Sequence, residues 1–427
     1  MTAVLNHRPT SSTAELAQVL RAGALRCVYQ PLVDLRSGGA VGHEALLRGP
    51  RGSALESPLA LLDAARAAGR LGELERASLE HSLRVVGHRS EGRPVTLFVN
   101  VEPTTLTRRL DVVLDALADR PPHVQVVVEI TERALAADPA GILAAADALR
   151  VAGCAIALDD VGAEPASLAF VPLLRPEVVK LDLALLRTLD DPMTVTVAGA
   201  VRAYAEESGA EVVAEGIEVE DDLTRALVLG ATLGQGWLWG RPDETLAPTA
   251  PATERFVAHR VDPVPHATPY AAVAGDSRLS RAPKRLLLPL SHTLELAAMQ
   301  SRLPPLLLAC FQHVRHLTPA TARRYTGLAS HLPFVGVLGE HMPAEPVPGV
   351  LGGPLHPDDP LALEWTVVVL GAHESAALVA RGVAPDPGGS RPTAQPDGDR
   401  EFDFVVTHDR GRVTAVAQVL IGRLAPS

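Results

Sequence analysis

The sequence is poor in aromatic residues and in net positive charge, and each shortage excludes a class of partner. Aromatic side chains make up 3% of the 427 residues, which argues against a surface on which the bases of single-stranded nucleic acid stack. The formal net charge is −11, which disfavours electrostatic binding to nucleic acid or to an anionic membrane. We therefore expect neither a nucleic acid polymer nor a membrane among the partners.

Cysteines and long apolar runs are also scarce. The three cysteines Cys27, Cys154 and Cys310 are odd in number and far apart, so they predict neither a disulfide framework nor a CxxC metal site. There is no run of 18 uninterrupted apolar residues, and the polar stretch 1–13 lacks the apolar centre of a signal peptide. We expect a cytoplasmic protein.

Short apolar runs that alternate with helical stretches dominate the first half of the chain. Apolar residues account for 47% of the sequence, enough to bury sizeable cores. Strands separated by helices of this length predict right-handed βαβ units and a parallel sheet, and about eight strands in this space indicate a closed barrel. The expected strands are 28–35, 41–47, 95–101, 124–130, 154–159, 178–181, 211–214 and 231–233.

The length and the change in pattern predict two domains. The expected divisions are an N-terminal extension (1–19), a barrel (20–242), a linker with one short helix (243–280) and a smaller α/β domain (281–427). In the smaller domain, residues 374–379 are expected to form a helix. The stretch 384–400, rich in Pro, Gly and Asp, is expected to form a mobile surface loop.

Polar residues recur where the expected barrel strands end. Glu44, Asn100, Glu129 and Asp159 each follow an apolar run, and a charged residue at the carboxyl end of a buried strand indicates chemistry rather than packing. These residues supply only hard oxygen ligands, which favours Mg²⁺, Mn²⁺ or Ca²⁺ over Zn²⁺. Asp160 can contribute to a second ion.

Carboxylates that share one barrel mouth repel each other. A like-charge pair about 5 Å apart costs roughly 3 kcal/mol at an effective dielectric constant of about 20, and Lys180 alone offsets too little of it. Two divalent cations would suffice, and a two-metal site suits in-line attack of water on a phosphodiester. Any one of these residues alone could be a solvated or helix-capping residue, but six consecutive units repeat the pattern. By contrast, Glu164, Glu177, Glu206 and Glu207 are expected to be solvated.

A family resemblance rests on ordered motifs. The segment Glu44-Ala45-Leu46-Leu47-Arg48 resembles the signature that names the EAL family of cyclic di-GMP phosphodiesterases, and the similarity covers about residues 20–242. The other motifs, in the family's order, are Tyr29-Gln30-Pro31, Asn100, Glu129-Ile130-Thr131-Glu132, Asp159-Asp160, Lys180-Leu181-Asp182, Glu215-Gly216-Ile217-Glu218 and 235–242. The family's fold, a TIM-like (β/α)8 barrel, agrees with the strand count.

The resemblance implies hydrolysis of cyclic di-GMP to the linear dinucleotide pGpG with Mg²⁺ or Mn²⁺, and inhibition by Ca²⁺. It assigns the first metal to Glu44, Asn100, Glu129 and Asp159, and the second metal to Asp160. Glu215 would be the general base, and Lys180 would orient the water or stabilise developing charge. Substrate contacts would come from Arg48, Leu46, Gln30, Gln235 and Pro242, with Gln235 also supporting the water at the metal site, and Glu132 would anchor a loop.

One loop departs from the family pattern. Residues 161–167 read Val-Gly-Ala-Glu-Pro-Ala-Ser, whereas active members usually carry a loop resembling Phe-Gly-Thr-Gly-Tyr-Ser-Ser. Glu102 also stands where many members have Ser.

Two hypotheses therefore stay open: a phosphodiesterase regulated by a sensory domain, or a receptor that binds cyclic di-GMP without hydrolysis. Members commonly pair through this loop, which makes a homodimer plausible.

The carboxyl-terminal region resembles a second family. Residues 280–284, Cys310-Phe311-Gln312 and 402–409 are similar to the DICT domain, a sensory module. Its ligand is not indicated by the sequence. Histidines such as His313 and His316 could serve a metal or redox sensor, but their scatter favours solvated or structural roles.

Overall fold

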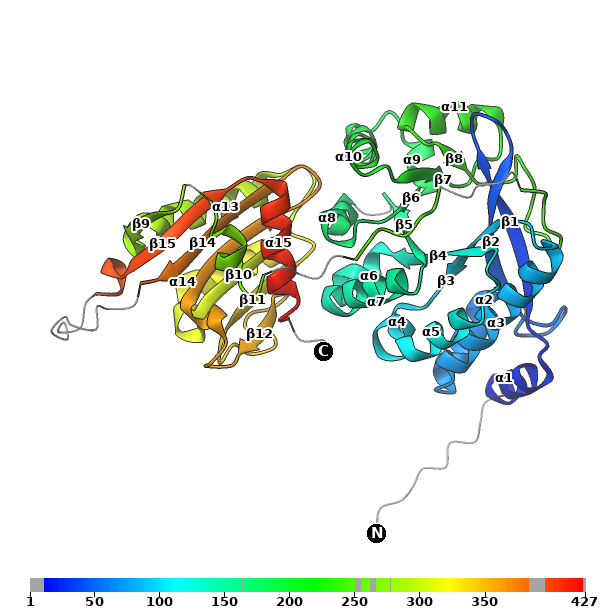
Figure 1. Cartoon of the computed structure of the whole chain (residues 1–427), viewed down its shortest axis with the longest axis horizontal. Helices are drawn as coiled ribbons and strands as arrows, with labels where there is room; N and C mark the ends of the chain where they lie inside the picture. Colours follow the sequence, from blue (N-terminus) through cyan, green and yellow to red (C-terminus); the bar gives the residue numbers. More distant parts are fainter. Residues whose placement is uncertain are drawn as a thin grey trace, which may run out of the picture. The chain divides into compact units, whose positions relative to one another are not determined.

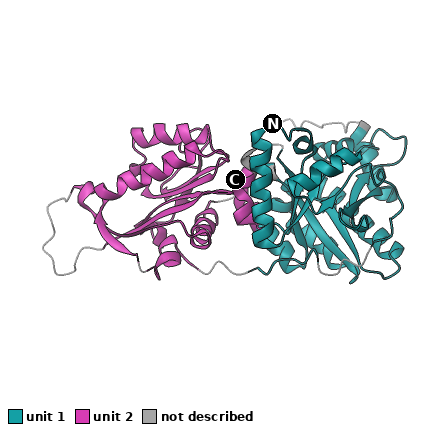
Figure 2. Ribbon diagram, turned by 90° about the horizontal axis from the view of Figure 1, so that it is seen from above, with its two compact units in different colours: residues 1–134, 144–163, 176–261 teal, residues 135–143, 164–175, 262–427 magenta. Residues whose placement is uncertain are grey.

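The computed structural model describes residues 11–162, 165–249, 255–261, 266–276, 278–383 and 396–424, without the side chains of residues 11, 132 and 165–167. These residues form two compact units (Figure 2). All strands of the barrel belong to the unit built from residues 1–134, 144–163 and 176–261. The second sheet belongs to the unit built from residues 135–143, 164–175 and 262–427.

The first unit holds a closed barrel of eight strands (Figure 1), which confirms the predicted fold. Its strands are β1 Arg26–Asp34, β2 Ala40–Arg48, β3 Val95–Asn100, β4 Val124–Thr131, β5 Ala155–Val161, β6 Val178–Leu181, β7 Glu211–Ala214 and β8 Leu233–Gly234. From β2 to β8, each strand pairs parallel with the next strand in the series. Their carboxyl ends therefore share one rim, where a barrel of this kind carries its chemistry.

Helices separate the barrel strands. They are α1 Ser11–Ala22, α2 Pro58–Ala67, α3 Leu71–Arg89, α4 Pro103–Arg108, α5 Leu110–Ala118, α6 Glu132–Ala137, α7 Pro139–Val151, η1 Pro165–Phe170, α8 Val171–Leu174, α9 Leu183–Arg187, α10 Pro192–Ser208 and α11 Glu220–Leu229. Helices α4 and α5 meet at Arg109. Helix α1 lies partly within the predicted extension 1–19. No described helix is both long enough and apolar enough to cross a lipid bilayer.

The first strand corrects the prediction of an all-parallel barrel. Strand β1 pairs antiparallel with both β2 and β8. Only residues 35–39 connect β1 to β2, and a parallel connection needs a crossover of about a dozen residues or more. The antiparallel register places Gln30 directly opposite Glu44.

A segment within the predicted linker packs against the barrel. Phe256 is fully buried in the core cluster that includes Phe98 and Val127, and its ring meets that of Phe98 edge-on at 5.3 Å. The Arg255 guanidinium lies 2.5 Å from the Asp34 carboxylate, and the Gln125 side chain donates to the Phe256 carbonyl. Residues 255–261 are therefore part of the barrel unit.

We predict that Phe256→Ala lowers the free energy of unfolding of the barrel by about 3–5 kcal/mol, because it leaves a cavity in the core. The matched control is Val257→Ala, whose side chain is 59% exposed and which should change stability by less than about 0.5 kcal/mol. Urea denaturation measures both. Equal small losses would show that the segment does not pack in the core.

The second unit contains a seven-stranded mixed sheet with the order β12-β11-β10-β13-β14-β15-β9. Its strands are β9 Ser280–Pro283, β10 Leu306–His313, β11 Val335–Glu340, β12 Leu351–Leu355, β13 Glu364–Leu370, β14 Ser375–Gly382 and β15 Glu401–Thr407. Its helices are α12 Pro269–Val273, α13 Lys284–Gln300, η2 Val314–His316, α14 Pro319–Ala329, η3 Pro360–Leu363, η4 Asp397–Asp399 and α15 Arg410–Ile421. Helices α13 and α14 share one core cluster with strands β10, β11, β13 and β14.

One expectation about this unit changes. The helix expected over 374–379 is wrong, because these residues enter β14, which is paired on both sides by β13 and β15. Burial in the middle of a sheet outweighs the helix propensity of Ala376 and Ala377. Helix α12 is the short helix expected before residue 280. Most of the predicted mobile loop, residues 384–395, lies outside the described residues.

Candidate active site

Polar side chains from four strand ends of the barrel surround a single buried amine. The Lys180 side chain is 1% exposed, and its Nζ lies 2.7 Å from Glu129 Oε1 and 2.7 Å from Glu215 Oε1. Nζ also lies 3.2 Å from Asp159 Oδ1 and 3.6 Å from Glu44 Oε2. The structure thus brings together five of the residues that the sequence pattern singled out.

Two amide side chains fix the orientation of Glu44. Asn100 Nδ2 donates to Glu44 Oε1 and Gln235 Nε2 donates to Glu44 Oε2, each over 2.7 Å. Gln235 Nε2 also lies 3.2 Å from Gln30 Oε1, within reach because β1 is antiparallel to β2. Donation through nitrogen leaves the carbonyl oxygens of Asn100 and Gln235 as acceptors.

A bulge presents two consecutive carboxylates at the end of β5. Neighbouring residues of a regular strand point to opposite faces, but the pairing of β5 with β6 shifts register between Leu158 and Val161. Asp160 has a φ of 59°, a left-handed conformation that is rare outside glycine and is concentrated at functional sites. One ligand atom each of Asp159, Asp160 and Glu215 lies within 4.8 Å of the others.

Gly236 fixes the backbone next to Gln235. A Cβ atom at this position would lie 2.0 Å from the Ile217 carbonyl oxygen, so no other residue fits without moving the backbone. The Ile217 amide donates to the Gln235 carbonyl over 3.0 Å. This close approach joins the segment after Glu215 to the segment that carries Gln235.

Charge in this cluster is unbalanced. Four carboxylates face one ammonium group. Glu129 Oε2 and Gln235 Oε1 are buried and accept no hydrogen bond from the described residues, whereas Lys180 Nζ lies within ion-pair distance of Glu129 Oε1 and Asp159 Oδ1. Buried acceptors without donors are costly, and divalent cations would satisfy them.

The proton affinities of the carboxyl groups differ for local reasons. Burial, with repulsion from Glu44, raises the pKa of Glu129 well above its usual value. Burial would also raise the pKa of Glu44, but the Lys180 charge and the donors Gln235 and Asn100 outweigh it and lower that pKa. Burial, opposed by Lys180, raises the pKa of Glu215 to about 7.

The donor set fits hard divalent cations. All the ligand atoms on offer are carboxylate or amide oxygens, which are typical of Mg²⁺, Mn²⁺ and Ca²⁺ sites rather than Zn²⁺ sites. Asp160 is more exposed than Asp159; burial and the neighbouring Asp159 charge raise its pKa. The cluster thus offers oxygen ligands at its buried centre and at its exposed edge.

Comparison with known families agrees with this geometry. The family described as the EAL domain matches residues 13–242, more than half of the chain. The chain belongs to the EAL family. A second family, described as a sensory domain in diguanylate cyclases and two-component systems (DICT), matches residues 271–382.

Relatives of the EAL barrel include two proteins of Pseudomonas aeruginosa. Cyclic di-GMP phosphodiesterase RocR is 31% identical over 239 residues, which are 54% of this chain and 60% of RocR. Cyclic di-GMP phosphodiesterase NbdA is 29% identical over 264 residues, 59% of this chain and 32% of NbdA. The chain thus spans less than two thirds of these relatives.

Solved structures similar to the EAL barrel include complexes. A structure titled PaMucR phosphodiesterase, c-di-GMP complex, is 27% identical, covers 55% of this chain and 98% of its own, and has a TM-score of 0.49. A manganese and cyclic di-GMP complex of Klebsiella pneumoniae BlrP1 is 28% identical, covers 52% of this chain and 56% of its own, and has a TM-score of 0.46.

The remaining predicted site residues of the EAL barrel lie at its edge. Leu46 and Arg48 are half-buried at the end of β2, and Arg48 Nη1 donates to the Leu47 carbonyl over 2.7 Å. Pro242 precedes Asp243, whose backbone pairs with that of Tyr29 beside Gln30. The side chains of Glu132 and of residues 163–167 lie outside the described residues, so loop anchoring and pairing through this loop stay predictions.

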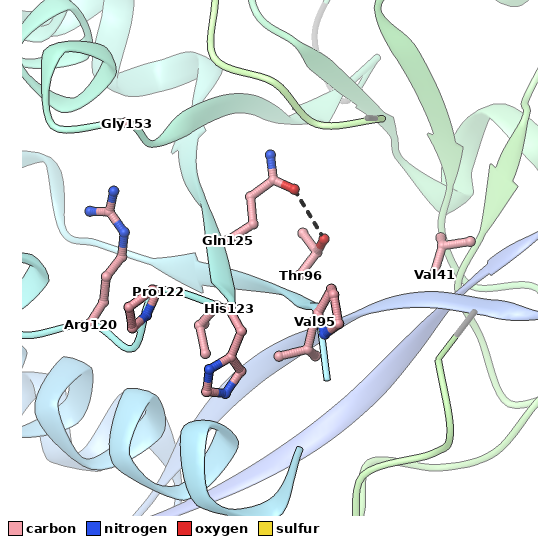
Figure 3. Close-up of a pocket in the computed structure, with 10 residues that line it drawn as sticks. Val41, Val95, Thr96, Arg120, Pro122, His123, Gln125 and Gly153 are labelled. Carbon is pink, nitrogen blue, oxygen red and sulfur yellow. Dashed lines mark hydrogen bonds between the residues drawn. The ribbon is translucent and has the colours of Figure 1, made fainter. Parts of the chain in front are cut away.

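The opposite end of the EAL barrel also carries a hollow (Figure 3). This cavity of about 340 Å³ lies at the start of β3 and β4, where Thr96 donates to Gln125 over 3.5 Å. Arg120 and His123 line it as well. None of the residues around Lys180 lines this cavity. The site predicted from the strand ends therefore lies at the rim formed by the carboxyl ends of the parallel strands.

Two glutamates of the EAL barrel are buried although the sequence did not predict it. Glu177 is not solvated: it is 4% exposed, accepts from Arg150 Nε over 2.9 Å, and accepts from the Ile156 amide over 2.8 Å. Glu75, which sequence reasoning missed, is buried and accepts from the Glu102 amide over 3.0 Å. Glu75 thereby holds the backbone just after Asn100, while the Glu102 carboxylate pairs with Arg66 at 2.7 Å.

We predict that Mn²⁺ raises the melting temperature of the protein, because a ligand at 100 times its Kd adds about 2.7 kcal/mol to stability. Glu129→Gln should lose most of this shift while melting no lower than the unchanged protein without metal, because burial and repulsion from Glu44 already raise the pKa of Glu129 and disfavour its charged form. Glu206→Gln, an exposed glutamate on α10, is the control. An unchanged Mn²⁺ shift in Glu129→Gln would contradict the assignment.

Proposed function

We propose that the EAL barrel hydrolyses one phosphodiester bond of cyclic di-GMP in a metal-dependent reaction that yields linear pGpG, and that the C-terminal sensory domain regulates it. This proposal rests mainly on the cluster around Lys180, where four carboxylates meet one ammonium group and where Glu129 Oε2 and Gln235 Oε1 have no donor among the described residues. Such a cluster is expensive unless cations complete it. A site with bound cations suits a phosphodiester substrate.

Residues at the buried centre would hold the first cation. These are Glu44, Asn100, Glu129 and Asp159, and the exposed Asp160 would contact the second cation. The cations supply charge neutralisation and activation of water. We expect Mg²⁺ or Mn²⁺ to support turnover and Ca²⁺ to inhibit it, because Ca²⁺ prefers more ligands and a looser geometry.

Glu215 would take the proton from the attacking water. A general base acts best when its pKa lies near the working pH, and burial raises the pKa of Glu215 to about 7. The Lys180 Nζ, 2.7 Å from Glu215 Oε1, would keep this carboxylate in place and stabilise negative charge that develops on the phosphate. Lys180 lies in β6 and Glu215 directly follows β7, which favours a fixed reaction geometry.

Residues at the rim would bind the nucleotide. Arg48 can pair with a phosphate through two parallel N–H donors of its planar guanidinium group. Leu46 would form the apolar floor of the nucleotide site. Gln30 would contact the substrate from β1, and Pro242 would contact it from the segment that pairs with β1. Gln235 would hold water through its free carbonyl oxygen.

We predict that Glu215→Gln lowers kcat for cyclic di-GMP by roughly 10²–10⁴-fold, the usual contribution of a general base. Binding of cyclic di-GMP should change little, since the substitution leaves the proposed nucleotide contacts of Arg48, Leu46, Gln30 and Pro242 intact. Chromatography of the linear product measures turnover, and calorimetry measures binding in the presence of Ca²⁺. Glu207→Gln, exposed on α10, is the matched control.

The same assay distinguishes the receptor hypothesis. Tight binding with no product from the unchanged protein in Mg²⁺ and Mn²⁺ would replace the enzyme with a cyclic di-GMP receptor, which the altered loop 161–167 motivates. Absence of binding under all three cations would exclude both functions.

A further inference from the structure

A cavity in the second unit has the properties of a small-molecule site. Its volume is about 360 Å³, near the lower end of the range of roughly 300–1,000 Å³ for such sites. It lies between helices α13 and α14 and the strands β10, β13 and β15, which contribute Leu288, Phe311, Trp365 and Phe402. All of these residues belong to one compact unit.

Aromatic rings gather around this cavity although the chain has few of them. The whole sequence contains 7 Phe, 3 Trp and 4 Tyr, yet Phe311, Trp365 and Phe402 all line this one space. Trp365 meets Phe402 edge-on at 6.0 Å, and Tyr325 packs against Phe311 at 5.2 Å. Rings held in this way form flat apolar walls, which favour a flat and largely apolar ligand.

Charged side chains at the cavity already have partners. Lys284 is paired with Asp397, and Arg324 is paired with the buried Glu295. Tyr325 also donates to Glu295 over 3.0 Å, which fixes that carboxylate. An anionic ligand that draws Arg324 away would leave the buried Glu295 carboxylate without its cation, which is costly, and Lys284 is already engaged by the more exposed Asp397. The cavity therefore favours a neutral ligand over nucleotides and carboxylates.

Two polar groups can orient such a ligand. His316 Nδ1 donates to the Phe311 carbonyl over 2.7 Å, so its Nε2 is an acceptor, and burial lowers the pKa of His316 and keeps the ring neutral. Gln312 is 7% exposed and has a φ of 66°. Its Oε1 accepts a hydrogen bond from Arg400 over 3.4 Å. The amide nitrogen of Gln312 can therefore donate to a different acceptor. The cavity thus offers one acceptor and one donor beside its aromatic walls.

We propose that this cavity is the ligand site of the sensory domain and that it takes a neutral, flat heteroaromatic molecule with a hydrogen-bond donor next to an acceptor. The ligand's donor meets His316 Nε2 and its acceptor meets the Gln312 amide. This site is separate from the residues around Lys180, and its occupancy does not depend on phosphodiesterase activity.

The test uses the full chain and three probes that differ in one property each. Quinolin-2-one is flat, neutral and carries adjacent N–H and C=O groups; 2-oxo-1H-quinoline-4-carboxylate keeps these groups but is anionic; octahydroquinolin-2-one keeps the bicyclic amide without the aromatic ring. Saturation-transfer NMR and calorimetry should show that quinolin-2-one binds, while the other two bind at least 10-fold more weakly. Absence of quinolin-2-one binding at millimolar concentration, or equal binding of the carboxylate, overturns the proposal.

Variants locate the binding. His316→Leu should weaken quinolin-2-one at least 10-fold, whereas His373→Leu, an exposed histidine of the same unit, should leave it unchanged. Gln312→Asn tolerates the left-handed backbone and shortens the donor, so it should also weaken binding and serves if His316→Leu does not fold. Melting temperatures verify folding. Unchanged affinity in a folded variant of either residue overturns the assignment.

Discussion

The Lys180 ammonium group, buried among carboxylates from four strands, is the constraint on which the barrel site depends. A buried charge survives only when it is paired, and here Glu129 and Glu215 both lie 2.7 Å from Nζ. Removing the ammonium group would leave the carboxylates to repel one another, and removing the carboxylates would leave a cation in an apolar barrel. The fold supports this arrangement because parallel strands end on one rim, which places distant residues of the sequence within a few ångströms.

The same constraint explains why the site is ready for cations. One ammonium group cannot neutralise four carboxylates, and the donors that orient Glu44 do not extend to Glu129. As a result, the pKa of Glu44 is lowered and that of Glu129 is raised. The imbalance is the physical basis of the proposed metal dependence. The cavity of the sensory domain differs, because Lys284 and Arg324 are each paired and its walls are aromatic.

The residues around Lys180 were predictable because each follows an apolar run, and strand ends in a parallel barrel converge. The antiparallel β1 was not predicted, since apolar alternation carries no information on strand direction; only the short 35–39 connection indicates it. The left-handed Asp160 depends on a register shift between β5 and β6. Burial of Phe256 and Glu177 depends on partners far away in sequence, which a local pattern does not show. In the second unit, His313 lies with the consecutive residues Glu340 and His341 so that one ligand atom of each is within 4.8 Å of the others, although His313 is far from them in the sequence.

The most direct test of this account is anomalous diffraction from crystals grown with Mn²⁺ and cyclic di-GMP. We expect two manganese peaks at the rim of the barrel, one bound by Glu44, Asn100, Glu129 and Asp159 and one bound by Asp160, with Lys180 still beside Glu215. The absence of manganese from this cluster at saturating Mn²⁺, with nucleotide bound elsewhere, would contradict it.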